Sequence, residues 1–347
     1  MSSNNALIDA ITLRQILIER YSRGEAKKLV KNLTRLSRQL KETVNSDYGR
    51  VRAVRLAQQV TRITETILNE YGDEMIVGLK EFGKEEAEFI AQALLATTAA
   101  EAVSSPSLRQ IQASITKVPM RLISGKKTQT LTIEEAVKVF TKNRSKEIGQ
   151  IIRDGSLVGK TSQELVKDID EVVGGKFKSQ AETLVRTSTN HMGNIARSAT
   201  YKANDDVIIG EEYTATLDSR TSISCSSLDG QIFPIGKGPI PPIHFGCRSV
   251  RVPKVNPKFD LGSEIVGERA SIDGPVPGNV TYGGFLKRQN AAVQNEVLGV
   301  ERAKLFRSGK LSIGKFTDDS GKVYSLQRLK ELNPLAFNSA SSTKNGQ

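Results

Sequence analysis

The sequence predicts a mostly helical α+β protein, in which long amino-terminal helices precede a helical module with a small β-sheet and a loop-rich Cys/His site. Three observations indicate this fold class. Apolar residues recur every three or four positions from residue 5 to about 100. After Glu211, β-forming residues alternate with small ones. Every histidine and cysteine lies between residues 191 and 247. The length of 347 residues is sufficient for one large domain or for two to three ordinary ones.

The amino-terminal stretch has the spacing of long helices that each bury one face. Glycine and proline are rare here, so we expect several helices in a bundle or an extended hairpin. A Ser/Pro-rich break around Pro106 and a polar loop after Gly125 predict a linker near 103–130. The apolar positions include Leu29, Leu33, Leu36, Leu40, Val44, Val60, Ile63, Ile67 and Tyr71. The candidate break points are Gly24, Gly49, Gly72, Gly78 and Gly83.

Residues 131–205 predict a series of shorter helices. Thr-x-x-Glu patterns at Thr132 and Thr161 have the spacing of capping boxes, which mark helix starts. The glycine pair 174–175 is expected to end the second of these helices, because glycine is a poor helix former. A third helix is expected over 180–202.

The pattern after Glu211 predicts a small sheet, followed by further helices. A Gly/Pro-rich loop separates the second and third predicted strands. The expected strands cover 212–217, 231–235 and 248–253; the expected helices cover 282–307 and 325–332. Three parts are therefore predicted: a basic helical region (1–120), a module (121–335, with its motif core at 180–255) and a flexible tail (336–347).

The net charge of +12 is concentrated near the amino terminus. Residues 1–60 contain twelve basic and five acidic side chains. Such an excess can attract nucleic acid or an acidic protein surface through its summed field, or can be a solvated helix face. If double-stranded DNA is contacted, the expected residues are Lys27, Lys28, Lys31, Arg35 and Arg38.

Several functional classes lack their sequence signature. No apolar run approaches the roughly 18–20 residues of a membrane span, and the first residues lack the pattern of a secretory signal. The phosphate-binding Walker loop, the dinucleotide fingerprint, G-x-S-x-G and H-E-x-x-H do not occur. We therefore expect a protein with no membrane span and without a standard enzyme motif.

The histidines and cysteines are candidate metal ligands. The H-x-x-C spacing of His244 and Cys247 allows two ligands to face one ion, while Cys225 and His191 come from a preceding loop and helix. Together the four could hold a structural zinc ion, which takes four nitrogen or sulfur ligands. Two alternatives are reduced core thiols with locally bonded imidazoles, and a Cys225–Cys247 disulfide, which is disfavoured inside cells.

The same segment carries the strongest motif of the chain. Residues 216–230 read T-L-D-x-R-T-x-x-x-C-x-x-x-D-G, and residues 241–248 read P-P-x-H-x-x-C-R. With the Arg-Thr pair at Arg186, this pattern resembles the phage Mu F-like minor head protein family, also called the phage head morphogenesis domain. The resemblance covers roughly 130–330.

The resemblance implies a bacteriophage virion protein: a low-copy minor head protein in the capsid interior or at the portal. It would be made in the host cytoplasm and act in head assembly, and in DNA packaging or ejection. Expected partners are portal, capsid or scaffolding proteins, with double-stranded DNA. The expected role is not enzymatic. The rivals are a zinc-dependent hydrolase or maturation enzyme of the phage head, and a plain DNA-binding protein.

The remaining motif residues are expected to order loops. A carboxylate in a turn can accept backbone N–H groups, and an arginine fork can bind a carboxylate or loop carbonyls. The Asp-Gly pair at 229–230 is a turn signal between strands. The residues assigned to this structural role are Arg186, Asp218, Arg220, Thr221, Asp229, Gly230 and Arg248.

Overall fold

The computed structural model of the chain describes residues 2–125, 127–262 and 267–337. Its fold is mostly helical with small antiparallel sheets, which confirms the predicted α+β class. The residues form two compact units, each assembled from separate stretches. The predicted division at 120/121 and 335/336 stays a prediction. Unit 1 comprises Met1–Gln15, Ala87–Pro106 and Ala196–Gln347, and unit 2 comprises Ile16–Glu86 and Ser107–Ile195.

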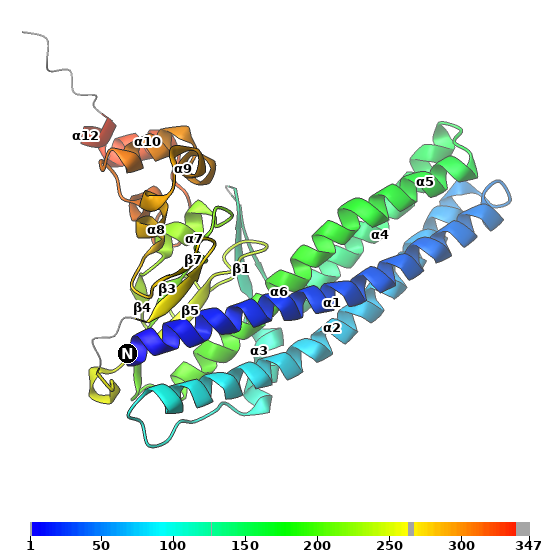
Figure 1. Cartoon of the computed structure of the whole chain (residues 1–347). Helices are drawn as coiled ribbons and strands as arrows, with labels where there is room; N and C mark the ends of the chain where they lie inside the picture. Colours follow the sequence, from blue (N-terminus) through cyan, green and yellow to red (C-terminus); the bar gives the residue numbers. More distant parts are fainter. Residues whose placement is uncertain (1, 126, 263–266, 338–347) are drawn as a thin grey trace, which may run out of the picture. The chain divides into compact units, whose positions relative to one another are not determined.

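Two long helices form the amino-terminal region, as predicted. Helix α1 spans Ser3–Asp47 and α2 spans Ala53–Thr97 (Figure 1). The chain reverses between them at Gly49, whose φ of 80° is a conformation that glycine adopts without steric cost. The predicted apolar positions from Leu29 to Val44 are buried.

The other four candidate break points lie inside helices, so those predictions were wrong. Gly24 is part of α1, and the other three are part of α2. A Cβ atom at Gly72 would lie 2.5 Å from Cγ1 of Val137. The missing side chain therefore permits close packing of α2 on the next long helix.

The predicted linker at 103–130 is partly structured. It contains a helix and most of an antiparallel hairpin, whose Met120 and Leu122 are buried. The Ser/Pro-rich break and the polar loop gave no signal for these buried side chains. These elements are α3 (Leu108–Lys117), β1 (Met120–Ser124) and β2 (Lys127–Leu131).

Both predicted capping boxes are present. Thr132 caps α4 (Ile133–Leu157) and Thr161 caps α5 (Ser162–Val172), each paired reciprocally with the glutamate three residues later. The glycine pair 174–175 does not end the helical run, contrary to prediction. A π-helical turn, Val173–Phe177, joins α5 to α6 (Lys178–Lys202), and its two end residues are buried. Their packing outweighs the low helix propensity of glycine.

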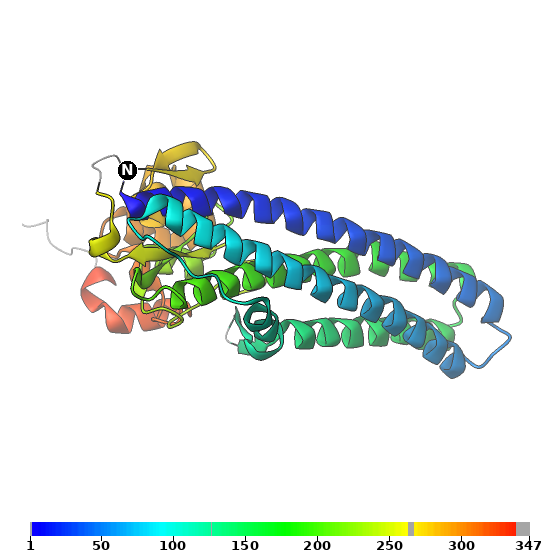
Figure 2. The ribbon, with the colours of Figure 1, turned by 90° about the horizontal axis from the view of Figure 1, so that it is seen from below.

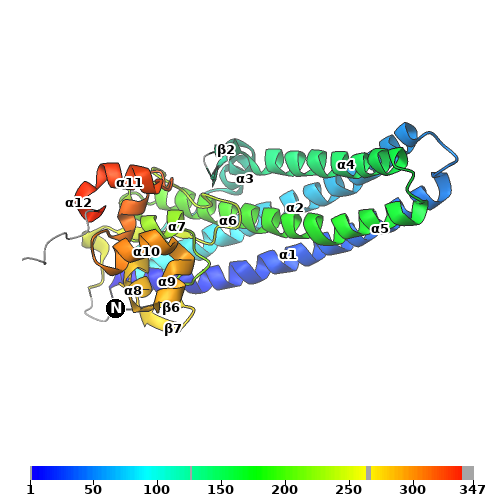
Figure 3. The same ribbon diagram turned by 90° about the horizontal axis from the view of Figure 1, so that it is seen from above.

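Within unit 2, helices α1, α2, α4 and the α5–α6 rod run alongside one another (Figures 2 and 3). Arg35 of α1 pairs with Glu70 of α2 at 2.8 Å. Lys41 of α1 pairs with Asp170 of α5 at 2.6 Å. The hydroxyl of Ser145 on α4 donates to Glu65 of α2. The helices of unit 2 thus form a bundle, the arrangement that the sequence favours.

Unit 1 contains the predicted sheet. Its strand order is β4-β3-β5, and both pairings are antiparallel. Valines of β5 pack with Leu7 and Ile11 of α1 and with Ile90 of α2 in one core of this unit. The strands are β3 (Ile208–Thr214), β4 (Ile232–Phe233) and β5 (Val250–Val255).

Short elements complete unit 1 around a second core. The expected helix over 282–307 is three helices, because Asn290 caps a new one and Gly299, at a φ of 75°, separates the last two. The expected helix over 325–332 is confirmed, with Ser325 as its cap. The tail residues 338–347 lie outside the described part of the chain. Among the described helices, none combines the length and apolar character needed to cross a membrane.

The remaining elements of unit 1 are α7 (Ile223–Leu228), a 3₁₀ turn (Pro257–Phe259), β6 (Glu268–Ser271), β7 (Gly274–Pro277), α8 (Tyr282–Arg288), α9 (Ala291–Leu298), α10 (Val300–Arg307), a second 3₁₀ turn (Ile313–Phe316), α11 (Leu326–Leu332) and α12 (Pro334–Phe337). Strands β6 and β7 form a two-stranded antiparallel hairpin. The second core includes Tyr213, Cys225, Cys247 and Tyr282, so the candidate site lies within it.

Candidate metal centre

Three of the four predicted ligands lie together in unit 1. Cys225 is on α7, where the cap residue Ser222 accepts a hydrogen bond from its backbone N–H. His244 and Cys247 come from the loop between β4 and β5. The ligand atoms of the three residues lie within 4.8 Å of one another. The cluster can therefore hold a metal ion.

The imidazole of His244 is oriented with Nε2 toward the thiols. Its Nδ1 lies 3.0 Å from the carbonyl oxygen of Phe245. A carbonyl only accepts hydrogen bonds, so Nδ1 carries the proton and Nε2 keeps its lone pair when the ring is neutral. Nε2 lies 3.1 Å from Sγ of Cys225 and 2.9 Å from Oγ of Ser222.

The two cysteines are free thiols in different electrostatic environments, with their sulfur atoms 3.6 Å apart. Burial raises the pKa of Cys225. Burial also opposes the charged form of Cys247, but hydrogen bonds from Cys225 and His244 hold the pKa of Cys247 well below its usual value. Burial lowers the pKa of His244, yet its bond to the Cys247 thiolate produces a net rise. A buried thiolate beside an imidazole is the donor set that a borderline-soft cation such as zinc prefers.

His191 lies elsewhere, in the part of α6 that belongs to unit 2. Its side chain is buried, and Nε2 donates to the carbonyl oxygen of Val118 at 2.9 Å. Burial lowers the pKa of His191 to about 4. His191 is not part of the cluster formed by Cys225, His244 and Cys247.

The neutral His191 predicts a specific acid sensitivity. Its folded-state pKa is about 4 against an ordinary 6.5. As the pH falls from about 6.5 to about 4, the unfolded chain takes up a proton at this histidine that the folded chain does not. The free energy of unfolding should therefore fall by about 3 kcal/mol from this residue alone. His191→Gln keeps an N–H donor for Val118 without titrating.

Urea unfolding of both proteins at several pH values measures this effect. The wild-type chain should lose more stability than His191→Gln as the pH falls. If the two proteins lost the same free energy of unfolding as the pH falls, the lowered pKa of His191 would be contradicted.

The predicted loop-ordering residue Asp218 is the centre of a hydrogen-bond network. Arg248 binds its carboxylate through both terminal nitrogens, with Nη2 2.8 Å from Oδ1. The backbone N–H of Arg220 and the hydroxyl of Thr221 also donate to Oδ1. The hydroxyl of Tyr282 donates to the backbone carbonyl of Asp218 at 2.7 Å. Asp218 thereby connects the turn before α7, through Arg248, to the loop that contains Cys247.

Asp229 forms a second network, whose main partner the sequence did not indicate. Arg269 of β6 donates to both carboxylate oxygens, at 2.6 and 3.1 Å. The backbone N–H groups of Ala215 and Tyr282 each donate to the same carboxylate at 2.6 Å. Gly230 follows at a φ of 79°, as expected for a turn. The side chains of Asp229 and Arg269 are almost fully buried.

A third buried pair, Glu211 and Arg251, was also missed. Arg251 of β5 is fully buried and donates to the carbonyls of Lys237 and Pro239, which fixes the loop that follows β4. Burial raises the pKa of Glu211 and lowers that of Arg251. A basic residue inside a predicted strand was the only sequence signal. Arg186 lies in unit 2, 3.5 Å from a Glu19 oxygen.

Comparison with known families decides the assignment. Residues 146–252 match the family model described as phage Mu protein F like protein. The chain carries a phage Mu F-like region. The match relates this region to phage head-related proteins. Comparisons with curated proteins and with solved structures found no match.

The Mu F-like region runs from within α4 to within β5 and covers less than a third of the chain. It contains the Cys/His/Cys cluster and the carboxylates of Asp218 and Asp229. Arg269, the buried partner of Asp229, lies beyond its end. The region therefore depends for one of its buried charges on a residue outside the matched segment.

The predicted DNA-contact residues lie on α1, outside the Mu F-like region. Lys28 pairs with Glu25 at 2.7 Å, and Arg35 pairs with Glu70. Lys27, Lys31 and Arg38 are exposed and form no ion pair with any described residue.

Proposed function

We propose that the protein is a low-copy minor structural component of the phage head. It would reside at the portal or in the capsid interior and act in head assembly and in DNA packaging or ejection, with portal, capsid or scaffolding proteins as partners. The observation that carries this proposal is the Mu F-like match at residues 146–252. Support comes from Asp218 and Asp229, whose carboxylates are used to hold loops.

We further propose that Cys225, His244 and Cys247 bind one structural zinc ion. Two thiolates and an imidazole are typical zinc ligands, and the buried position suits an ion that crosslinks α7 to the following loop. When bound, zinc would take the place of the proton that the thiols otherwise share with His244. The ion would stabilise a loop-rich region that has little regular secondary structure.

The number of protein ligands favours a second candidate, a zinc-dependent hydrolase or maturation enzyme of the phage head. Catalytic zinc sites commonly have three protein ligands and keep one position for water. Such a site also needs a general base. The carboxylates of Asp218 and Asp229 are each occupied by an arginine, which supports the structural role.

Head assembly without the protein tests the main proposal. Particles made without this chain should be defective in assembly, DNA content or infectivity, because a head component would be missing. The measurements are electron microscopy, DNA content per particle and plaque titre. Quantifying the chain in purified particles tests the low copy number.

Cleavage products distinguish the two candidates. One result is a Cys247→Ser protein that folds and is incorporated normally, in particles that accumulate an uncleaved protein or unprocessed nucleic acid. That result would favour the enzyme over the structural component. Normal particles in the complete absence of the chain would contradict both.

A further inference from the structure

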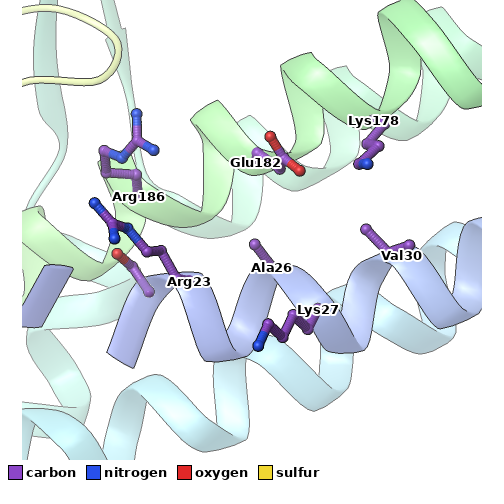
Figure 4. A pocket seen from close by; sticks show the side chains of 8 residues that line it. Arg23, Ala26, Lys27, Val30, Lys178, Glu182 and Arg186 are labelled. Carbon is purple, nitrogen blue, oxygen red and sulfur yellow. The ribbon is translucent and has the colours of Figure 1, made fainter. Parts of the chain in front are cut away.

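A positively charged pocket lies between α1 and α6 within unit 2. It has a volume of about 410 Å³. Its lining residues are Ser22, Arg23, Ala26, Lys27, Val30, Lys178, Glu182 and Arg186. Figure 4 shows Lys178 and Glu182 extending from α6 toward α1. Four of the eight lining residues are cationic and one is acidic.

The pocket residues follow helical spacing on both sides. Arg23 and Lys27 are one turn apart on α1, and Lys178, Glu182 and Arg186 are each one turn apart on α6. Arg23 and Lys27 carry like charges at this spacing and repel each other, whereas Glu182 attracts both of its neighbours, Lys178 and Arg186. The lining still has more cationic than acidic side chains, so a bound anion would lower its electrostatic free energy.

Arg186 has unused hydrogen-bonding capacity. Its Nε is buried, and no described residue accepts a hydrogen bond from it, although a Glu19 oxygen lies 3.5 Å away. Arginine nitrogens in a fork match the oxygens of a phosphate, and lysines add point charges. Ser22 is buried at the edge of the same pocket.

We propose that this pocket binds a phosphate group, and that in the head protein proposed above the phosphate belongs to the DNA backbone. Lys27 of the pocket continues along α1 into Lys31 and Arg38, which are exposed. The pocket would hold one phosphate, and the stripe would follow the phosphates beyond it. This inference rests on the proposed function only for the source of the phosphate.

Salt-dependent binding of the full-length protein to a short duplex of random sequence tests the inference. Arg23→Gln combined with Lys178→Gln should weaken binding about tenfold. The slope of log affinity against log salt should flatten by about 1, since the pocket holds one phosphate and each lost phosphate contact contributes about 0.9. Glu182→Gln should tighten binding, because it removes the acidic residue that competes with the phosphate.

The matched control removes the same charge outside the pocket. Lys142→Gln combined with Lys146→Gln, on α4, should leave the slope nearly unchanged. Thermal melts of every variant confirm folding. In a second experiment, inorganic phosphate competes with the duplex for the protein, and its own binding to each variant is measured. Loss of phosphate binding in the pocket variant, with no duplex binding by any protein, supports the pocket and identifies a free ion as its ligand.

Two outcomes overturn the inference. If the pocket variant binds duplex and phosphate as the wild type does, while Lys31→Gln with Arg38→Gln loses the duplex, the DNA contact holds and the pocket plays no part in it. If the wild type binds neither probe at low salt, the pocket is not a phosphate site. In both cases the particle experiments still decide the proposed function.

Discussion

The Cys247→Ser variant should lose the bound metal and most of the stability of unit 1. Serine is nearly isosteric with cysteine, but its hydroxyl remains protonated at neutral pH and is a poor zinc ligand. Cys247 is fully buried, and its thiolate is the anionic donor of the cluster. Structural zinc in small peptides contributes an apparent 10–16 kcal/mol, roughly, at neutral pH. A contribution of this size is comparable to the whole free energy of unfolding of a typical domain, about 5–15 kcal/mol.

Elemental analysis and thermal unfolding measure this effect. The wild-type protein should contain about one zinc per chain and melt at a lower temperature after chelation. Ser226→Ala is the matched control, because it removes a buried hydroxyl next to Cys225 that donates a hydrogen bond to the carbonyl of Ile223. That variant should keep its zinc and lose only about 1 kcal/mol.

Two results would change the interpretation of the cluster. A metal-free wild-type protein with an unchanged melt after chelation would show that the thiols and the imidazole simply pack and hydrogen-bond. A Cys247→Ser protein that is stable and metal-free would instead favour the enzyme, because a catalytic ion is not required for the fold. The structural proposal expects metal and stability to be lost together.

Local sequence signals predicted the elements that depend on neighbouring residues. The threonine and glutamate of a capping box are three residues apart, so Thr132 and Thr161 marked helix starts correctly. His244 and Cys247 were paired correctly for the same reason. Cys225 was grouped with them because every histidine and cysteine lies between residues 191 and 247. The chemistry of these side chains is visible in the sequence, as is the short spacing of the capping boxes and of His244 and Cys247.

Long-range contacts could not be predicted in this way. Arg269 lies 40 residues from Asp229 and outside the motif, and only the fold brings β6 to the turn. His191 is close to the cysteines in sequence, but the long α6 places it in a different unit. The glycines at 174–175 were overruled by burial of Val173 and Phe177. These three outcomes depend on tertiary packing, which cannot be read from a short stretch of sequence.

The Asp229→Asn variant should be the most destabilising single change in the motif outside the cluster. Asparagine keeps the shape and one acceptor oxygen but removes the charge that balances Arg269. Arg269 would then remain in a site where its side chain is only 4% exposed. Breaking one side of a buried pair typically costs about 3–5 kcal/mol, because an uncompensated charge stays buried. Part of that cost is the weaker acceptance of the two backbone N–H bonds from Ala215 and Tyr282.

Denaturant unfolding of a double-mutant cycle separates these contributions. Arg269→Met alone should also cost several kcal/mol, since it leaves the Asp229 carboxylate buried without its cation. The double variant should lose less than the sum of the two single losses, because neither charge is then stranded. The surface pair Lys304 and Glu301, at 2.8 Å with side chains 61% and 57% exposed, is the control. Neutralising either of its residues should change stability by under about 0.5 kcal/mol. Strictly additive losses for Asp229 and Arg269 would mean that the two side chains contribute independently, through their separate contacts to backbone groups.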